Sequence, residues 1–227
     1  FFLTTENDFK EVNYKIDYDM CRPSFILING SLERRKNPEI CRRSDSSWIK
    51  DSLKKSKFLR FLKIKIDTYN QDESLMNSEE LPSRYYVYQK RNKNYEESFL
   101  LTEKIILEAK NYSERLGSKF LLVISANLIQ VSKRKQQEVL QKFPELKNEG
   151  WDFENPDKLI ERFCENNRVD CLYLLPSFKE YANKTNISLH FYKDEHFNEL
   201  GNRVFADKLY DYIIEKPYFN LFKYADT

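Results

Sequence analysis

The sequence is poor in glycine and contains no long apolar run. Only four of its 227 residues are glycine, and no apolar stretch reaches the length that a membrane-spanning helix needs. The formal net charge is +2, which gives no global signature of polyanion binding, so we expect no nucleic-acid partner. Charged residues make up 33% and hydrophobic residues 41%, which is typical of a globular domain.

Cysteine is also scarce, and the four cysteines are Cys21, Cys41, Cys164 and Cys171. No two of them form a Cys-x-x-Cys pair, which argues against a zinc knuckle. Cys164 falls in a helical pattern and Cys171 opens an apolar strand pattern, so both are predicted to be small buried hydrophobic residues. Cys21 and Cys41 flank a hairpin pattern and could pair only in an oxidising compartment.

The chain has only two histidines, His190 and His196. His190 is predicted to lie in a strand or loop near the core. As a metal ligand beside Asp194 and Glu195 it would belong to a sparse donor set, so we expect no metal site.

The N-terminal segment FFLTTENDF is apolar from its first residue and has no initiator methionine. It also has no basic region of the kind that begins a signal peptide. A run such as Phe1-Phe2-Leu3 is typical of a strand that is buried on both faces. We therefore expect the sequence to begin inside a domain, with part of that domain upstream.

The second half of the chain alternates helix and strand patterns. Apolar residues recur at roughly helical spacing in 95–116, 155–166 and 199–215. Short apolar runs typical of buried strands lie at 119–125 and 170–176. Strands that alternate with helices predict an α/β domain with a mostly parallel sheet.

Residues from about 9 to 94 interrupt this alternation and are predicted to be an insertion in a single domain that spans residues 1–227. Two strand-like arms surround Asn29-Gly30, a pair suited to a type I′ hairpin turn. From Lys50 to Lys65, seven basic residues accompany one acidic residue, Asp51, in an imperfect helical pattern. This basic helix could contact a membrane surface or a polyanionic glycan. The alternative, which we favour, is a solvated helix face whose apolar stripe lies on the core.

The segment DEHFN near the end of the chain is the first candidate for chemistry. In an extended segment, side chains two residues apart point the same way, so Asp194 and His196 are expected to face one site, with Glu195 turned away. The carboxylate could then hold the imidazole in one tautomer. Asn198 is a natural N-cap for the helix that follows, and Gly201 would allow close backbone packing. The alternative is a surface histidine before a capped helix.

The segment TENDF near the start is the second candidate. A strand that ends in Asn7-Asp8 places polar side chains at the carboxyl edge of the sheet, where open α/β sheets bind ligands. The side-chain amide of Asn7 could donate a hydrogen bond to a developing oxyanion. The alternative is a turn, since Asn-Asp pairs are common in turns.

Together, the two segments resemble the SGNH (GDSL-type) hydrolase family. FFLTTENDF resembles the family's third conserved block, a strand that ends in Gly-Asn-Asp. YKDEHFNELGNRVFADKLYDYI is similar to its last block, in which an acid and a histidine precede a helix. RPSFILINGSLE and CENNRVDCLYLLPSFKE match intermediate segments of one bacterial branch. The resemblance runs from Phe1 to about Glu215.

The resemblance implies a three-layer α/β/α sandwich around a mostly parallel sheet. It also implies ester hydrolysis or acyl transfer without a metal or organic cofactor. His196 would be the general base, Asp194 would orient it, and Asn7 would be an oxyanion-hole donor. The substrate would be a small ester or an acylated glycan. An extracytoplasmic or membrane-associated location is slightly favoured.

The sequence departs from the family pattern in three places. The first block, Gly-Asp-Ser with the nucleophile, and the second block, with an oxyanion-hole glycine, would both lie upstream of Phe1. Glu6 stands where the third block usually has glycine, and we expect its carboxylate to point away from the site. Ser31 lies at a hairpin tip and is not expected to replace the missing serine.

We therefore expect the C-terminal portion of a serine-type ester hydrolase, inactive without its nucleophile segment. Two alternatives stay open. One is an O-acyltransferase that acts on a surface polysaccharide, and the other is a non-catalytic, hydrolase-like binding domain.

Overall fold

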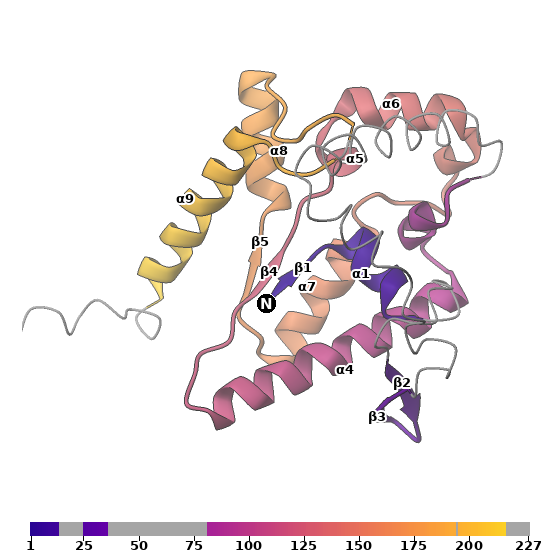
Figure 1. Cartoon of the computed structure of the whole chain (residues 1–227). Helices are drawn as coiled ribbons and strands as arrows, with labels where there is room; N and C mark the ends of the chain where they lie inside the picture. The colour runs from indigo at the N-terminus through magenta and orange to yellow at the C-terminus, as the bar shows by residue number, and fades with distance from the viewer. Residues whose placement is uncertain (14–24, 36–80, 194, 217–227) are drawn as a thin grey trace, which may run out of the picture.

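The computed structural model describes residues 1–13, 25–35, 81–193 and 195–216 (Figure 1). It is an α/β fold, as the sequence predicted, with a parallel sheet, a separate hairpin and many helices. In chain order the elements, with η for a 3-10 helix, are β1 (Phe2–Leu3), α1 (Thr5–Glu11), β2 (Phe25–Ile28), β3 (Ser31–Arg34), η2 (Ser83–Tyr88), α4 (Lys93–Arg115), β4 (Leu122–Ile124), α5 (Leu128–Val131), α6 (Lys133–Lys142), η3 (Pro144–Lys147), α7 (Asn155–Asn167), β5 (Cys171–Tyr173), α8 (Leu175–Thr185) and α9 (Glu199–Glu215).

Among the described residues, three short parallel strands form a sheet in the order β1-β4-β5. Phe2 of β1 pairs with Val123 of β4, and Leu122 of β4 pairs with Cys171 of β5. Because successive side chains of a strand point to opposite faces, Leu122 and Ile124 share one face of the sheet and Val123 lies on the other. Both faces of the sheet are therefore apolar and need helices to cover them.

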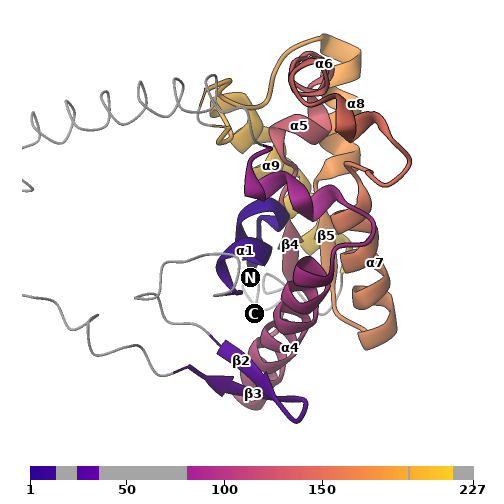
Figure 2. The same ribbon diagram turned by 90° about the vertical axis from the view of Figure 1, so that its right-hand side faces the viewer.

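Two apolar clusters lie on the two faces of the sheet. Ile106 of α4 and Ile160 of α7 belong to the cluster that contains Ile124. Phe178 of α8 and Val204 of α9 belong to the cluster on the opposite face. Figure 1 shows α9 on one side of the strands and α4 with α7 on the other, and Figure 2 gives the view turned by 90°. Helices thus pack against both faces of the described sheet.

Helix α9 begins and ends at the residues that the sequence predicted, Glu199 and Glu215. The side chain of Asn198 accepts a hydrogen bond from the backbone N–H of Gly201 at 2.9 Å, which confirms Asn198 as the N-cap. Helix α4 begins two residues before its predicted start because the side chain of Asn92 caps it. Local capping therefore sets where both helices begin.

Cys164 and Cys171 form a disulfide, so the prediction of two unlinked hydrophobic residues was wrong. Cys164 is buried near the end of α7, as predicted, and Cys171 opens β5. Arg168 ends α7 in the left-handed conformation, with φ of 51°, and turns the chain directly into the strand. This tight connection brings the two Cα atoms to 6.4 Å, within the usual range for a disulfide.

The hairpin of the predicted insertion is confirmed. Strands β2 and β3 pair antiparallel around Asn29-Gly30, where φ is 49° and 79°. The basic segment from Lys50 to Lys65 lies outside the described residues. Phe9 and Tyr88, near the two ends of the predicted insertion, are buried in the core. Within the described ranges, no helix combines the length and the apolarity needed to cross a bilayer.

The first turn of α9 packs closely on the chain before it. A Cβ atom at Gly201 would lie 2.0 Å from the backbone oxygen of Leu189. Alanine in a helix would ordinarily be more favourable than glycine by about 1 kcal/mol. Because the colliding atom belongs to the backbone, we expect Gly201→Ala instead to lower the free energy of unfolding by about 3 kcal/mol or more. Urea denaturation monitored by circular dichroism measures this change.

Gly150→Ala is the matched control for Gly201→Ala. Its added Cβ would meet only the side-chain oxygen of Asn148 at 3.1 Å, and that side chain can rotate away. We expect a change within about 1 kcal/mol for this variant. Equal stabilities for the two variants would contradict the close packing of α9.

Candidate functional site

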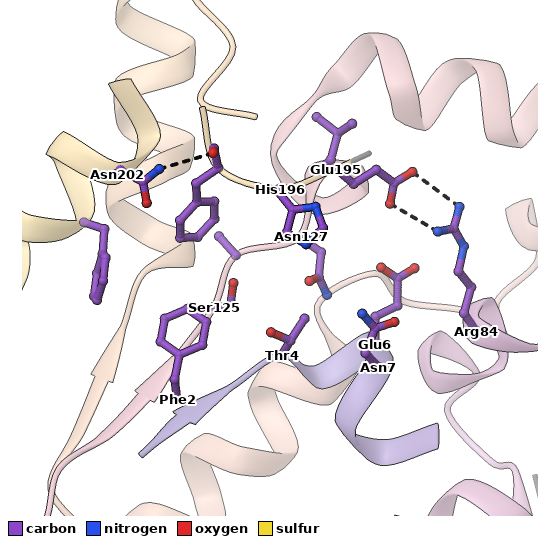
Figure 3. Close-up of a pocket in the computed structure, with 14 residues that line it drawn as sticks. Phe2, Thr4, Glu6, Asn7, Arg84, Ser125, Asn127, Glu195, His196 and Asn202 are labelled. Atoms are coloured by element: carbon purple, nitrogen blue, oxygen red, sulfur yellow. Dashed lines mark hydrogen bonds and ion pairs between the residues drawn. The ribbon is translucent and has the colours of Figure 1, made fainter. Parts of the chain in front are cut away.

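A cavity of about 420 Å³ opens at the carboxyl ends of β1 and β4 (Figure 3). Its walls come from β1 and the segment after it, from η2, from the segment after β4, and from α9 and the loop that precedes it. This edge of an open α/β sheet is where ligands commonly bind. The predicted site residues His196 and Asn7 both line the cavity, so the structure brings them together. Asp194 lies outside the described residues.

The loop of residues 189–198 presents His196 to the cavity. Backbone hydrogen bonds close this loop on itself. The N–H of Phe191 donates to the carbonyl of His196 at 2.8 Å, and the N–H of Asn198 donates to the carbonyl of Leu189 at 3.0 Å. The side chain of His196 is exposed and lines the cavity, so it can reach a ligand there.

Asn7 lies in the first turn of α1, directly after β1. The carboxylate of Asp8 accepts a hydrogen bond from the backbone N–H of Thr4 at 2.6 Å and fixes the start of the helix. The Asn-Asp pair is therefore helical. The prediction of a strand that ends in this pair was wrong, since β1 ends at Leu3, and the isolated turn of the alternative interpretation does not form either. Asn7 is exposed and lines the cavity, so its side-chain N–H can donate to a ligand oxygen.

Glu6 was expected to point away from the site, and this expectation is wrong. Glu6 lines the cavity and is only 5% exposed, because α1 begins at Thr5 and its first turn directs Glu6 inward. Burial raises the pKa of Glu6 to about 7, while the nearby Arg84 guanidinium opposes this rise and the Glu195 carboxylate adds to it. A large fraction of Glu6 is therefore neutral near pH 7.

Glu195 was expected to turn away from the site, and it lines the cavity instead. Its φ is 63°, in the left-handed region, so the chain is not extended between Asp194 and His196, and alternation along a strand does not apply. Its carboxylate accepts hydrogen bonds from Arg84 at 3.3 and 3.4 Å and pairs with Lys135 at 3.0 Å. These two basic side chains hold Glu195 in the cavity wall.

The cavity also contains Ser125, Asn127 and Arg84, which the sequence did not single out. Ser125 and Asn127 follow the carboxyl end of β4. The tendency of ligands to bind at the carboxyl ends of parallel strands would therefore have identified both residues. The carboxamide of Asn127 donates to the hydroxyls of Thr5 at 3.3 Å and Tyr88 at 3.2 Å, which fixes its orientation. Arg84 had no local signal, because its partner is 111 residues away along the chain.

His190 lies near the core, as predicted, and is only 3% exposed. Its Nε2 donates to the carbonyl of Ala126 at 2.8 Å, and burial lowers the pKa of the ring, so His190 is neutral near pH 7. The ring ties the loop that carries His196 to the end of β4. In the part of the chain that the structure describes, no group of three His, Cys, Asp or Glu side chains is placed to hold a metal ion.

The buried Glu6 carboxyl gives the protein a stability that depends on pH. Its pKa is about 7 in the folded chain and 4.5 as the ordinary value. The favourable contribution of Glu6 to the free energy of unfolding is therefore complete below about pH 4.5, and it is lost as the pH rises through about 7. Relative to Glu6→Gln, which does not ionise, we expect the wild type to lose about 3 kcal/mol of unfolding free energy across this interval.

Urea denaturation at several pH values between these limits measures the difference. Glu199→Gln, an exposed change in the first turn of α9, is the control and should keep the wild-type profile. An unchanged profile in Glu6→Gln would show that Glu6 does not retain its proton on folding.

No family model, curated protein or solved structure matches the chain. The cavity itself combines an exposed imidazole, an exposed carboxamide and a buried carboxyl of raised pKa. An imidazole can transfer a proton, and a carboxamide can donate to an oxygen that gains negative charge. These are the groups that acyl transfer needs beside a nucleophile.

Proposed function

We propose that the cavity is the base and oxyanion side of a serine-type ester hydrolase that acts on a carboxylester or an O-acyl group. The observation that supports this most is that His196 and Asn7, from opposite ends of the chain, line one cavity at the ligand-binding edge of the sheet. The complete domain is proposed to be the three-layer α/β/α sandwich of the SGNH hydrolases. The parallel sheet with helices against both faces is consistent with that architecture.

In the proposed reaction, a serine hydroxyl attacks the ester carbonyl and His196 takes its proton as general base. The oxyanion that develops accepts a hydrogen bond from the side-chain N–H of Asn7. His196 then gives the proton to the leaving alcohol. Water attacks the acyl-serine in the same way and releases the acid. Asp194 is proposed to hold the imidazole and to stabilise its protonated form.

The serine is proposed to come from a Gly-Asp-Ser segment, which residues 1–227 do not contain. The cavity wall offers two other hydroxyls, on Thr4 and Ser125. Ser125 is only 5% exposed, and its backbone N–H donates to the carbonyl of Leu3 at 2.8 Å. It therefore lacks the exposed position on a sharp turn that a nucleophilic serine typically occupies.

Residues 1–227 alone are expected to show no turnover of a short-chain nitrophenyl ester and no labelling by a fluorophosphonate, because the covalent step lacks its serine. The same chain, joined to a Gly-Asp-Ser segment encoded upstream in its reading frame, is expected to hydrolyse the ester and to be labelled on that serine. Mass spectrometry locates the label. Labelling of Ser125 or Thr4 would contradict the proposed source of the nucleophile.

Two further outcomes identify the alternatives. Transfer of the acyl group to an added oligosaccharide in preference to water would identify an O-acyltransferase. Binding of the ester without hydrolysis, in a protein that contains the Gly-Asp-Ser segment, would identify a non-catalytic binding domain.

A further inference from the structure

A carboxyl group lies beside the proposed oxyanion donor, and the proposed reaction does not use it. Glu6 and Asn7 are neighbours in the first turn of α1, and both line the cavity. In Figure 3 both side chains project from α1 toward the cavity, with the Arg84–Glu195 pair beyond Glu6. A ligand oxygen that reaches Asn7 therefore comes close to Glu6.

The surroundings of Glu6 leave its carboxyl without a direct ionic partner among the described residues. The two terminal nitrogens of the Arg84 guanidinium are engaged by both oxygens of Glu195 and by the hydroxyl of Tyr85, while its buried Nε has no hydrogen-bond partner among the described residues. The Oε1 atom of Glu6 is buried and has no hydrogen-bond partner within the described ranges. A buried carboxyl in this position avoids much of its desolvation cost when it is protonated.

We propose that Glu6, as a neutral carboxyl, donates its O–H to the same ligand oxygen that Asn7 binds. This inference rests on the proposed function, since it makes Glu6 a second donor to the oxyanion. A neutral carboxylic acid is a stronger donor than an amide. Once ionised, it has no proton to donate and repels a negatively charged oxygen. Glu6 would thus favour an anionic ligand oxygen at low pH and oppose it at high pH.

Arg84 and the three tyrosines near Glu6, which are Tyr85, Tyr88 and Tyr95, keep their charge states between about pH 6 and 8.5. Burial raises the pKa of each of these tyrosines, so they stay neutral. Burial acts to lower the pKa of Arg84, but the nearby Glu6 and Glu195 carboxylates raise it overall, so the guanidinium stays charged. The charged and titratable groups that act on Glu6 or share its cavity are Arg84, Tyr85 and Tyr88 from η2, Tyr95 from α4, Lys135 from α6, and Glu195 and His196 from the loop before α9.

Acetate binding tests the proposal, because acetate offers a negatively charged oxygen and needs no nucleophile. The probe is acetate added to residues 1–227, with dissociation constants from NMR titration. We expect the wild type to bind acetate at least about tenfold more weakly at about pH 8.5 than at about pH 6, since only neutral Glu6 favours the anion. The glutamine side chain in Glu6→Gln still has an N–H donor but does not ionise. Most of the pH dependence of acetate binding should therefore disappear in this variant.

His196→Asn removes the imidazole, which lines the same cavity as Glu6. If Glu6 causes the pH dependence of acetate binding, this variant keeps the larger part of that dependence. A dependence that survives Glu6→Gln but vanishes in His196→Asn would overturn the proposal, and so would the absence of acetate binding by the wild type at about pH 6.

A second measurement uses only the wild type and does not depend on how a variant folds. The carboxyl ¹³C shift of Glu6 reports its protonation, and saturating acetate should raise the midpoint of that titration because binding and protonation are linked. An unchanged midpoint would overturn the proposal. Since no turnover is involved, the inference can fail or hold separately from the hydrolase function.

Discussion

His196→Ala, made in the protein that contains the nucleophile segment, is expected to lower kcat by about four to six orders of magnitude. The imidazole is the proposed group that removes the serine proton and returns it to the leaving alcohol. Alanine cannot move a proton, so only the oxyanion donors and substrate binding remain. Steady-state hydrolysis of a short-chain nitrophenyl ester measures the loss, and circular dichroism checks that the variant folds.

Chemical rescue distinguishes proton transfer from a structural role. Added imidazole should restore part of the activity of His196→Ala, because a small base can occupy the space of the missing ring. Glu199→Gln, an exposed change three residues away, is the control and should keep wild-type turnover. A loss of less than about tenfold in His196→Ala, well below what removal of a general base causes, would contradict its role.

Asp194→Asn offers a graded comparison within the same segment. An acid that only orients and stabilises the imidazole should matter less than the imidazole itself, so this variant is expected to keep more turnover than His196→Ala. Glu195→Gln cannot serve as a control that leaves turnover unchanged, because Glu195 binds Arg84 and Lys135 in the cavity wall. Its replacement is expected to disturb the loop that presents His196.

Asn7→Ala is expected to lower kcat by about 10² to 10³ with little change in KM, because its amide donates mainly to the oxyanion of the transition state. Steady-state kinetics of the protein with its nucleophile segment measure both parameters. A rise in KM at unchanged kcat would show instead that Asn7 binds substrate and transition state equally well.

Asn202 provides the matched control for Asn7. It is another asparagine that lines the cavity, but its carboxamide donates to the carbonyl oxygens of Phe197 at 3.3 Å and Asn198 at 3.1 Å. Asn202→Ala should therefore act on the start of α9 and affect stability more than kcat. Equal losses of kcat in Asn7→Ala and Asn202→Ala would contradict the proposed role of Asn7 as the oxyanion donor.

The sequence predicted the parts of this fold that local chemistry controls. Helix α9 was predicted from about Glu199 to Glu215, which agrees with its observed bounds, because Asn198 caps it and apolar residues follow at helical spacing. Asn7 was selected because polar residues that follow a parallel strand lie at the carboxyl edge of the sheet, although β1 ends earlier than predicted, at Leu3, and Asn7 lies in the first turn of α1. Both signals lie within a few residues of the feature that they predict.

The sequence could not predict the features that depend on distant partners. Glu195 lies in the cavity wall because Arg84, 111 residues earlier, and Lys135 bind it there. Glu6 is buried because the tertiary structure covers it, whereas its carboxylate was expected to point away from the site. The disulfide of Cys164 and Cys171 depends on how α7 turns into β5. None of these features leaves a periodic pattern in the sequence.

The most direct test is the structure of the nucleophile-containing protein after reaction with an alkyl phosphonate ester, which forms a mimic of the tetrahedral intermediate on the attacking serine. We expect the phosphonyl oxygen to lie about 3 Å from the side-chain nitrogen of Asn7, with the imidazole of His196 on the side of the leaving group. A phosphonyl oxygen remote from Asn7, or an adduct on Ser125, would contradict it.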